Sequence, residues 1–424
     1  MLLINLANYY KRLDLVWFGL VRLDLVWLGK IRLDWVKIDM SSPLFSKLSA
    51  GYFWYFSILG MVVPFLPIYL DSKGFSSLQI GEILAIVTAT KIIGPTLWAM
   101  LADKSGKQIT IIRLGALLAL ACFSLLFFVE HYWPITFVLA IFSLFWTAIL
   151  PQLEVLTLNS VRRNAKIYAR IRLWGSIGFI ALAIITGELI AKYNAQAFTY
   201  IGLFILLALL LSTLLLKQPR TSITHLSAAS SLLSKICAPG FILFFLSGLL
   251  LQVSFGPYYS FFALFLRDLA YPGYAVGFFI SVAVVAEIMI FIFAGTLFKY
   301  FSIRSLMAMS LFITAIRWLL TAYYAGNAVA LGAIQLMHAA SFGIYHSASI
   351  LFVQQHFDRH QQNRGQAIFQ SGVYGIGGAI GAYLAGLLWL DGAGAVDTFE
   401  LAAYAAFMAT FLSFFITQNK PNNS

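Results

Sequence analysis

Residues 274–298 read YAVGFFISVAVVAEIMIFIFAGTLF, an almost unbroken apolar run in which Glu287 is the single charged residue. An α-helix needs about 20 such residues to cross the hydrocarbon core of a bilayer. The whole chain of 424 residues shares this character, with 61% hydrophobic and 10% charged residues and a mean hydropathy of +0.87. Soluble domains carry about 25% charged residues, and barrel strands are much shorter than these runs. The sequence therefore predicts a helical membrane protein.

The apolar runs predict twelve membrane spans, separated by short polar breaks. The spans are residues 50–70, 78–101, 109–129, 134–158, 170–191, 196–216, 239–266, 274–298, 305–325, 328–353, 363–389 and 397–417. The longest break, 217–238, divides them six and six, which is the two-halves design of secondary transporters. We expect an all-α fold of two pseudo-symmetric six-helix halves, 41–216 and 239–417, joined by the cytoplasmic loop 217–238 and followed by a tail, 418–424.

The basic residues predict the orientation of these spans. If the N-terminus is cytoplasmic, nearly all Lys and Arg residues fall on the cytoplasmic side, and the opposite side holds only Lys73, Lys192 and Arg267. The positive-inside rule then places both termini in the cytoplasm. This distribution explains the net charge of +12 without a nucleic-acid partner. We expect a monomer that is integral to the bacterial inner (plasma) membrane.

Two further features concern cysteine content and the N-terminal region. Cys122 and Cys237 are the two cysteines, which supports neither a disulfide framework nor a metal cluster, and we expect no cofactor. Residues 11–40 repeat a ten-residue phrase that begins at Arg12, Arg22 and Arg32. Ten residues turn a helix by about 1,000°, so a helix would scatter these charges around its surface. We expect residues 1–40 to lie outside the fold, as a translated tandem DNA repeat or alternatively an interfacial arm, and we expect no cleavable signal peptide.

Three ionisable residues interrupt apolar helices of the second half. Glu287 lies in the middle of the eighth span, Arg317 near the middle of the ninth and His338 on the tenth. A charge at the bilayer centre costs about 2.5–3.5 kcal/mol on insertion scales, so each is a functional candidate. Apolar surroundings favour a neutral carboxyl group, and a nearby guanidinium favours the carboxylate. We expect Glu287 to pair with Arg317 as a proton switch, with a purely structural buried acid as the alternative.

The first half contributes Glu154, late in the fourth span, and Arg172, at the start of the fifth. We expect the two to pair across a helical hairpin and to grip a hydroxyl-rich or carboxylate substrate through bidentate hydrogen bonds. The alternative for Arg172 is simple anchoring at the cytoplasmic surface. Lys91 lies in the middle of the second span, where it lines a cavity or pairs with an acid.

Three segments resemble the major facilitator superfamily, within the group around lactose permease and phenylpropionate permease. They are GYFWYFSILGMVVPFLPIYL (51–70), GPTLWAMLADKSGK (94–107) and YARIRLWGSIGFI (168–180), and the resemblance covers about residues 50–417. LADKSGK is similar to the superfamily's loop between the second and third helices. This similarity implies a gating role for Asp103, Lys104 and Gly106.

The resemblance also implies roles for the charges inside the spans. In lactose permease an acid and an arginine at the places of Glu154 and Arg172 grip the sugar, which implies a substrate-binding role for both here. Glu287, Arg317 and His338 fall where that group keeps proton-coupling or substrate-linked residues.

Two departures argue against a lactose-like substrate. Sugar symporters carry a proton-bearing glutamate where this chain has Ser341, and a tryptophan that stacks on the sugar where it has Phe179. The sequences RLWGS, VVAEIMIF and AIRW look closer to the phenylpropionate permeases. The resemblance therefore implies a proton-coupled symporter that imports a small organic solute, such as an aromatic carboxylate of phenylpropionate type, with Phe179 in the substrate site. A sugar or nucleoside symporter is the alternative.

A membrane enzyme and a sensor are the alternatives to a transporter. A membrane acyl- or phosphotransferase would need catalytic groups clustered at an interface, and QQHFDRHQQNR (354–364) offers His356, Asp358 and His360. That segment is also an ordinary basic loop between spans, so we expect no enzyme. A sensor derived from a transporter would bind the solute without moving it across the membrane.

Overall fold

The computed structural model describes residues 43–161, 164–217, 232–358 and 361–417. Within these ranges, twelve helices are long and apolar enough to cross a membrane. The predicted spans are confirmed, and most of their bounds agree to within a few residues. The largest difference is at the first span, which is helical from Pro43 instead of residue 50. The expected extension, 1–40, and the expected tail, 418–424, lie outside the described residues.

The first six spans form the N-terminal half. Its helices are α2 (Pro43–Ser72), α3 (Ser77–Ser105), α4 (Gln108–Ser124) with the short η2 (Leu125–Phe127), α5 (Tyr132–Trp146), α6 (Ile149–Ser160), α7 (Ala165–Tyr193) and α8 (Ala197–Leu214). The fourth span is thus interrupted between α5 and α6. Within this half α2 packs against α7 and α8, while α4 packs against α5 and α8.

The last six spans form the C-terminal half, preceded by the short α9 (Leu233–Ile236). Its helices are α10 (Pro239–Ser254), α11 (Gly256–Ser260), α12 (Phe262–Asp268), α13 (Gly273–Tyr300), α14 (Ile303–Tyr324), α15 (Ala328–Leu336), η3 (Ala339–Ile344), α16 (Tyr345–His356), α17 (Gln362–Phe369), η4 (Gln370–Gly377), α18 (Gly378–Trp389), η5 (Leu390–Gly392) and α19 (Ala395–Ser413). Here α14 and α10 both pack against α19.

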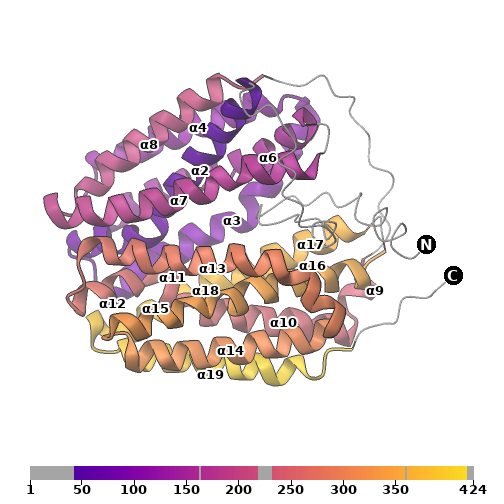
Figure 1. Cartoon of the computed structure of the whole chain (residues 1–424). Helices are drawn as coiled ribbons and strands as arrows, with labels where there is room; N and C mark the ends of the chain where they lie inside the picture. Colours follow the sequence, from indigo (N-terminus) through magenta and orange to yellow (C-terminus); the bar gives the residue numbers. More distant parts are fainter. Residues whose placement is uncertain (1–42, 162–163, 218–231, 359–360, 418–424) are drawn as a thin grey trace.

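The two halves lie side by side, as the indigo-to-magenta and orange-to-yellow helices of Figure 1 show. They meet through two pairs of helices, α3 against α18 and α7 against α13. In the first pair α3 is the second span of its half and α18 is the fifth span of the other half. In the second pair α7 is the fifth span of its half and α13 is the second span of the other half. This exchange is the arrangement that a pseudo-two-fold axis between two related halves produces.

Local signals fix the ends of α3, which carries part of the predicted site. At its start Ser76 and Gln79 form a reciprocal capping box, in which the Gln79 amide donates to Ser76 Oγ and the Ser76 amide donates to Gln79 Oε1. Such a box satisfies amide groups that have no partner within the helix. At its end Gly106 adopts φ 65° and donates its amide to the Ala102 carbonyl. Glycine reaches this left-handed conformation at little cost, so Gly106 ends the helix.

Three spans of the C-terminal half depart from regular α-helix. The seventh is broken into α10, α11 and α12, and the tenth and eleventh contain the π-helical segments η3 and η4. Residues of η3, η4 and α11 line the cavity described below. π-helical turns concentrate at functional sites because they re-aim side chains and leave backbone groups irregularly bonded.

Candidate substrate cavity and proton-coupling cluster

A cavity of about 670 Å³ lies between the two halves, within the usual range of about 300–1,000 Å³ for ligand sites. Residues of α2, α3 and α7 form one wall, and residues of α11, α13, η3 and η4 form most of the other. The lining is mainly apolar. Four of the predicted site residues belong to it, namely Arg172, Phe179, Glu287 and His338.

The cavity extends toward the side that the basic residues predict to be cytoplasmic. Its lining reaches Ala99 and Met100 near the end of α3 and Arg364 at the start of the eleventh span. At the outer ends of α3 and α18, the lining stops at Leu84 and Ala382. The structure is therefore the inward-open arrangement of the fold.

Glycine contacts close the outer side. A Cβ atom built on Gly81 of α3 would lie 2.6 Å from the Cα atom of Gly386 on α18, and one built on Gly187 of α7 would lie 2.2 Å from the carbonyl oxygen of Gly273 on α13. Both pairs join one half to the other, so the helices touch backbone to backbone. Small residues permit this close approach between membrane helices.

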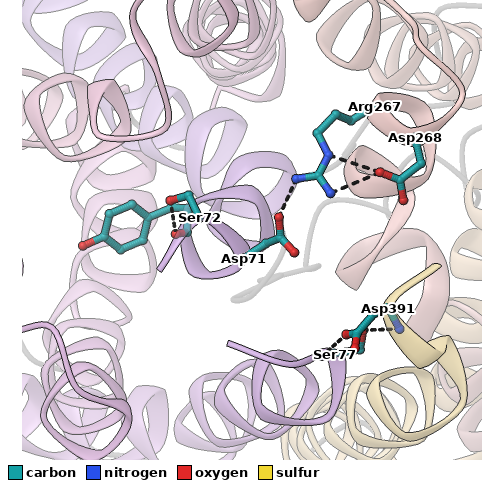
Figure 2. A network of polar contacts seen from close by, with 7 residues as sticks. Asp71, Ser72, Ser77, Arg267, Asp268 and Asp391 are labelled. Carbon is teal, nitrogen blue, oxygen red and sulfur yellow. Dashed lines mark hydrogen bonds and ion pairs between the residues drawn. The ribbon is translucent and has the colours of Figure 1, made fainter. Parts of the chain in front are cut away.

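Polar contacts reinforce this closure at the outer surface, and Figure 2 shows them. Arg267, at the end of α12, lies 2.5 Å from Asp71 at the end of α2 and 3.1 Å from its neighbour Asp268. Asp391, in η5, accepts hydrogen bonds from the Ser77 hydroxyl at 2.6 Å and the Ser77 amide at 2.9 Å. We call these five residues the outer latch, because both sets of contacts join the two halves.

The electrostatics of the latch favour a charged Arg267. Partial burial lowers the pKa of its guanidinium, but the hydrogen bonds and charges of Asp71 and Asp268 raise that pKa, and the net result lies above the ordinary value. The ion pair is nevertheless partly exposed, with 46% of the Arg267 side chain and 37% of the Asp71 side chain accessible. Exposed pairs contribute about 0.2–1 kcal/mol each. The latch therefore stabilises the state with a closed outer side only modestly.

The first testable prediction follows from that bias. In a background of Cys122→Ser and Cys237→Ser, an Ala263→Cys probe in the cavity wall is labelled by an impermeant maleimide added outside. Arg267→Gln is expected to speed this labelling about two- to fivefold, because losing up to about 1 kcal/mol opens the outer side more often. Lys73→Gln is the matched control, because Lys73 pairs with Glu130 of its own half at 3.8 Å. Equal labelling in all three proteins would contradict the assignment.

Arg317 is the centre of a buried polar cluster in the C-terminal half. Its side chain is completely inaccessible, and its guanidinium lies 4.5 Å from the ring centroids of Tyr258 and Trp318. It donates to Gln335 Oε1 at 3.0 Å and contacts His338 Nδ1 at 3.0 Å. Buried charges persist in proteins when such hydrogen bonds and aromatic faces replace the water they lose.

The cluster fixes the protonation pattern of His338. A guanidinium can only donate hydrogen bonds, so Nδ1 of His338 accepts the bond from Arg317. In a neutral imidazole the proton then sits on Nε2. That nitrogen faces Glu287 Oε2 at 3.5 Å, so Arg317 turns the N–H of His338 toward the carboxyl group.

The predicted direct pairing of Glu287 with Arg317 is wrong. The ion pairs among the described residues include Glu287 with His338 and none between Glu287 and Arg317. His338 lies between the two, and Arg317 is absent from the cavity lining. The physical reason is that Arg317 faces the interior of its own half, where Tyr258, Trp318 and Gln335 hold it. Arg317 therefore acts on Glu287 through the imidazole.

In the N-terminal half Arg172 lines the cavity, and its guanidinium lies 3.8 Å from the ring centroid of Phe56. Gly175 makes room for this position, since a Cβ there would lie 2.7 Å from Arg172 Nη1. Glu287 lines the same cavity from the other half. Arg172 is thus a cavity residue and not a surface anchor.

Glu154 and Phe179 occupy different depths of this half. Glu154 is completely buried and does not belong to the cavity lining. Phe179 belongs to the cavity lining. Its backbone is pressed against α2, since a Cβ on Gly60 would lie 2.4 Å from the Phe179 carbonyl oxygen. Phe179 and Arg172 therefore face the cavity, whereas Glu154 does not, and the substrate-binding role of all three stays a prediction.

The predicted gating residues lie at the cytoplasmic end of α3. Lys104 is exposed in the last turn, and Gly106 forms the left-handed cap. Asp103 belongs to the same turn, but its side chain lies outside the described residues. The gating role of all three stays a prediction.

Several residues of the site were missed by sequence reasoning. Gln335 and Tyr258 are uncharged residues within spans and carry no signal of their own, and the residues of the outer latch lie at the ends of spans, where polar and charged residues are common. Arg267 had the best available signal, because it is one of the few basic residues on the outer side. A basic residue on that side predicts an acidic partner at the end of a neighbouring span. For Lys91 the structure decides between the two alternatives, since it lines the cavity.

The comparison with protein families decides the membership of the chain. A family model described as the MFS_1 like family matches residues 45–401. The chain belongs to this family of the major facilitator superfamily. The fold agrees, because the structure of the nucleoside transporter NupG superposes with a TM-score of 0.76 over 89% of this chain and 100% of that one, at 18% identity.

Two curated relatives are more similar in sequence. The probable 3-phenylpropionic acid transporter of Escherichia coli is 27% identical over 352 residues, which is 81% of this chain and 90% of that protein. The maltose permease of Geobacillus stearothermophilus is 28% identical over 275 residues, which is 63% of this chain and 68% of that protein. This family member is a multi-pass membrane transporter of small solutes.

The enzyme alternative is therefore rejected. Two of the residues that suggested it have structural contacts in the described part of the chain. His356 donates from Nε2 to the Lys235 carbonyl at 2.8 Å, and Asp358 pairs with the Lys235 side chain at 3.6 Å. Both contacts tie the end of the tenth span to the segment that precedes the seventh. His360 lies outside the described residues.

Proposed function

We propose that the protein is a proton-coupled symporter that imports an aromatic monocarboxylate across a bacterial inner (plasma) membrane. The observation that carries this proposal is Glu287. Its side chain is buried, it lines the cavity, and its Oε1 has no hydrogen-bond partner among the described residues. An ionised carboxylate with one oxygen left without a donor in apolar surroundings is costly, and a protonated carboxyl group is much less so. Glu287 is therefore the group on which a proton binds and leaves during transport.

The two walls of the cavity provide a simple coupling mechanism. Arg172 and Glu287 line the cavity from opposite halves, so the positive charge of Arg172 offsets the negative charge of Glu287 while Glu287 is ionised. Once a proton neutralises Glu287, the positive charge of Arg172 is available to a substrate carboxylate. The carboxylate of Glu287 and the carboxylate of the substrate compete for the same positive charge. Binding of the proton to Glu287 and binding of the anion to Arg172 therefore favour each other.

The remaining residues of the site assist these two. Phe179 packs on the aromatic ring of the substrate, and Glu154 positions Arg172 from behind the wall. His338 contacts Glu287, and Arg317 is a positioning residue that holds the imidazole in the required tautomer. Asp103, Lys104 and Gly106 act where the two halves separate on the cytoplasmic side. We propose that a monomer performs this cycle by alternating access, with protons, the solute and the bilayer as its only partners.

The comparisons support this substrate class over the alternative. The relative named as a probable 3-phenylpropionic acid transporter aligns with a larger share of this chain than the maltose permease does. The mainly apolar cavity with aromatic side chains such as Phe56 and Phe179 suits a phenyl ring better than a hydroxyl-rich sugar. A sugar or nucleoside symporter is the second candidate, favoured by the maltose permease and by the fold of NupG.

Uptake into proteoliposomes tests the proposal. Labelled 3-phenylpropionate, maltose and a nucleoside are compared with and without a gradient of about one pH unit, acid outside. One pH unit corresponds to about 1.4 kcal/mol, or a tenfold driving force for one proton. Initial rates are taken above those of protein-free liposomes, because the undissociated acid crosses lipid unaided.

We expect the gradient to stimulate the protein-dependent uptake of 3-phenylpropionate several-fold and to leave maltose and nucleoside uptake at background. Stimulated uptake of the sugar or the nucleoside would establish the second candidate. Binding without any flux would favour a sensor. Uptake that ignores the pH gradient would reject proton coupling.

A further inference from the structure

Lys91 is the residue of the cavity that the mechanism above does not use. It lies in the middle of α3 and lines the cavity together with Leu84, Thr88 and Pro95. These positions are three or four residues apart, so they form one face of the helix. Lys91 therefore presents its side chain on the cavity face of α3.

The Lys91 ammonium has no partner of its own in the described part of the chain. The ion pairs found there are Lys73 with Glu130, Lys235 with Asp358, Arg267 with Asp71 and Asp268, and His338 with Glu287. Lys91 is in none of them, and no hydrogen bond to its side chain is found among these residues. A cation in a mainly apolar wall attracts an opposite charge more strongly than a cation in water does. Lys91 is partly exposed to the cavity, so an anionic ligand can supply that charge.

The charges of the lining point the same way. Lys91, Arg172 and Arg364 line the cavity with positive charge, and Glu287 is the acidic residue among the described residues that line it. Arg172 stacks on the ring of Phe56. Arg364 stands at the cytoplasmic mouth. Lys91 is thus the cation that lies at mid-membrane depth and is not engaged by the protein.

Close packing holds Lys91 at a fixed position. On either side of it along α3, Thr88 and Ile92 face the glycines of the eleventh span. A Cβ on Gly375 would lie 2.5 Å from Ile92 Cγ1, and one on Gly378 would lie 3.2 Å from Thr88 Cγ2. The backbone that carries Lys91 is therefore held against the opposite half, which keeps the base of its side chain at the wall of the cavity.

We propose that Lys91 binds the carboxylate of the substrate and determines the preference of the transporter for anions over neutral solutes. The inference rests on the proposed function and adds a residue that selects the substrate class. In this arrangement Lys91 holds the carboxylate together with Arg172 of the same cavity, while Phe179 and Phe56 flank the apolar part of the ligand. Lys91 discriminates between anionic and neutral ligands, and Glu287 with Arg172 couples that binding to the proton.

Chemical replacement of the charge tests this role. The chain has two cysteines, Cys122 and Cys237, so Cys122→Ser with Cys237→Ser gives a cysteine-free background for Lys91→Cys. The probes are 3-phenylpropionate and its neutral isostere 3-phenylpropanamide, and the affinity of the purified transporter for each is measured. The cysteine is then modified with an aminoethyl, a methyl or a sulfonatoethyl methanethiosulfonate.

We expect Lys91→Cys to weaken the binding of 3-phenylpropionate about tenfold or more, the loss typical of a charged hydrogen bond, and to leave the amide within about twofold. The aminoethyl reagent restores a positive charge, so it should recover most of the carboxylate affinity. The methyl and sulfonatoethyl reagents should not. Retained amide binding shows that the variant is folded, and a structural role for Lys91 would not distinguish the three reagents.

Two outcomes separate this inference from the proposed function. If the unmodified protein takes up 3-phenylpropionate with a proton and Lys91→Cys binds it equally well, the role of Lys91 is wrong and the proposed function stands. Equal rescue by the methyl reagent would also reject a role of charge. If the unmodified protein binds the amide as tightly as the carboxylate, or prefers maltose to both, the anion preference is wrong and so is the proposed substrate class.

Discussion

Replacing Glu287 with Gln is expected to abolish the stimulation of uptake by a proton gradient and to preserve exchange of substrate across the membrane. Glutamine has nearly the volume of the protonated acid and cannot ionise, so the variant resembles the proton-loaded state permanently. That state can still alternate with substrate bound, and counterflow of labelled 3-phenylpropionate should persist. The ratio of initial rates with and without a gradient of about one pH unit, up to about tenfold for one coupled proton, should fall to about one.

Glu82 provides the matched control for this measurement. It lies on α3, accepts a hydrogen bond from the Tyr132 hydroxyl at 2.8 Å within its own half, and does not line the cavity. Glu82→Gln should therefore keep the stimulation by the gradient. Unchanged stimulation in Glu287→Gln would show that the proton binds elsewhere. Loss of counterflow in that variant would show that Glu287 binds the substrate itself.

Replacing Gly81 with Ala is expected to open the outer side of the transporter. The new Cβ would lie 2.6 Å from the Cα of Gly386 and 2.8 Å from the Ala382 carbonyl oxygen. These neighbours are backbone atoms, which cannot rotate away, so α3 and α18 must separate. Overpacking of this kind costs about 1–3 kcal/mol, and the inward-open state bears this cost. The equilibrium should shift toward the outward-open state by about fivefold to 150-fold.

Labelling of the Ala263→Cys probe from outside measures this shift. Its rate should rise in Gly81→Ala well beyond the two- to fivefold expected for Arg267→Gln, because steric overlap of backbone outweighs one exposed ion pair. Gly332→Ala is the control, since a Cβ built on Gly332 meets nothing within 4 Å. Unchanged labelling in Gly81→Ala would mean that α3 and α18 accommodate the extra Cβ without separating. The closure of the outer side would then not depend on this contact.

The sequence was sufficient to predict the number and positions of the spans. Runs such as 274–298 are confirmed because the bilayer imposes a constraint along the chain, namely about 20 apolar residues for each crossing. The same constraint makes a buried charge conspicuous, and Glu287, Arg172 and His338 all line the cavity.

The sequence was less informative about which charges meet. It indicated that Glu287 and Arg317 share a half, but His338 lies between them. A helix turns by about 100° per residue, so contact between spans depends on the rotation of each helix, and hydropathy does not encode that rotation. The outer latch was missed for a related reason. Asp71, Arg267 and Asp391 lie at the ends of spans, where charged residues are common and have no evident partner until the halves are placed together.

The sequence by itself determined that this protein spans a membrane twelve times, that its basic ends face one side and that a few charges are buried at mid-membrane depth. The tertiary structure decided that Arg172 and Lys91 share a cavity with Glu287, that Arg317 reaches Glu287 through an imidazole, and that the outer side is closed. The physical reason is that the two kinds of feature depend on different parts of the chain. The cost of exposing polar groups to lipid acts on every residue along the chain, whereas contacts between halves depend on distances of a few ångströms between helices that are far apart in sequence.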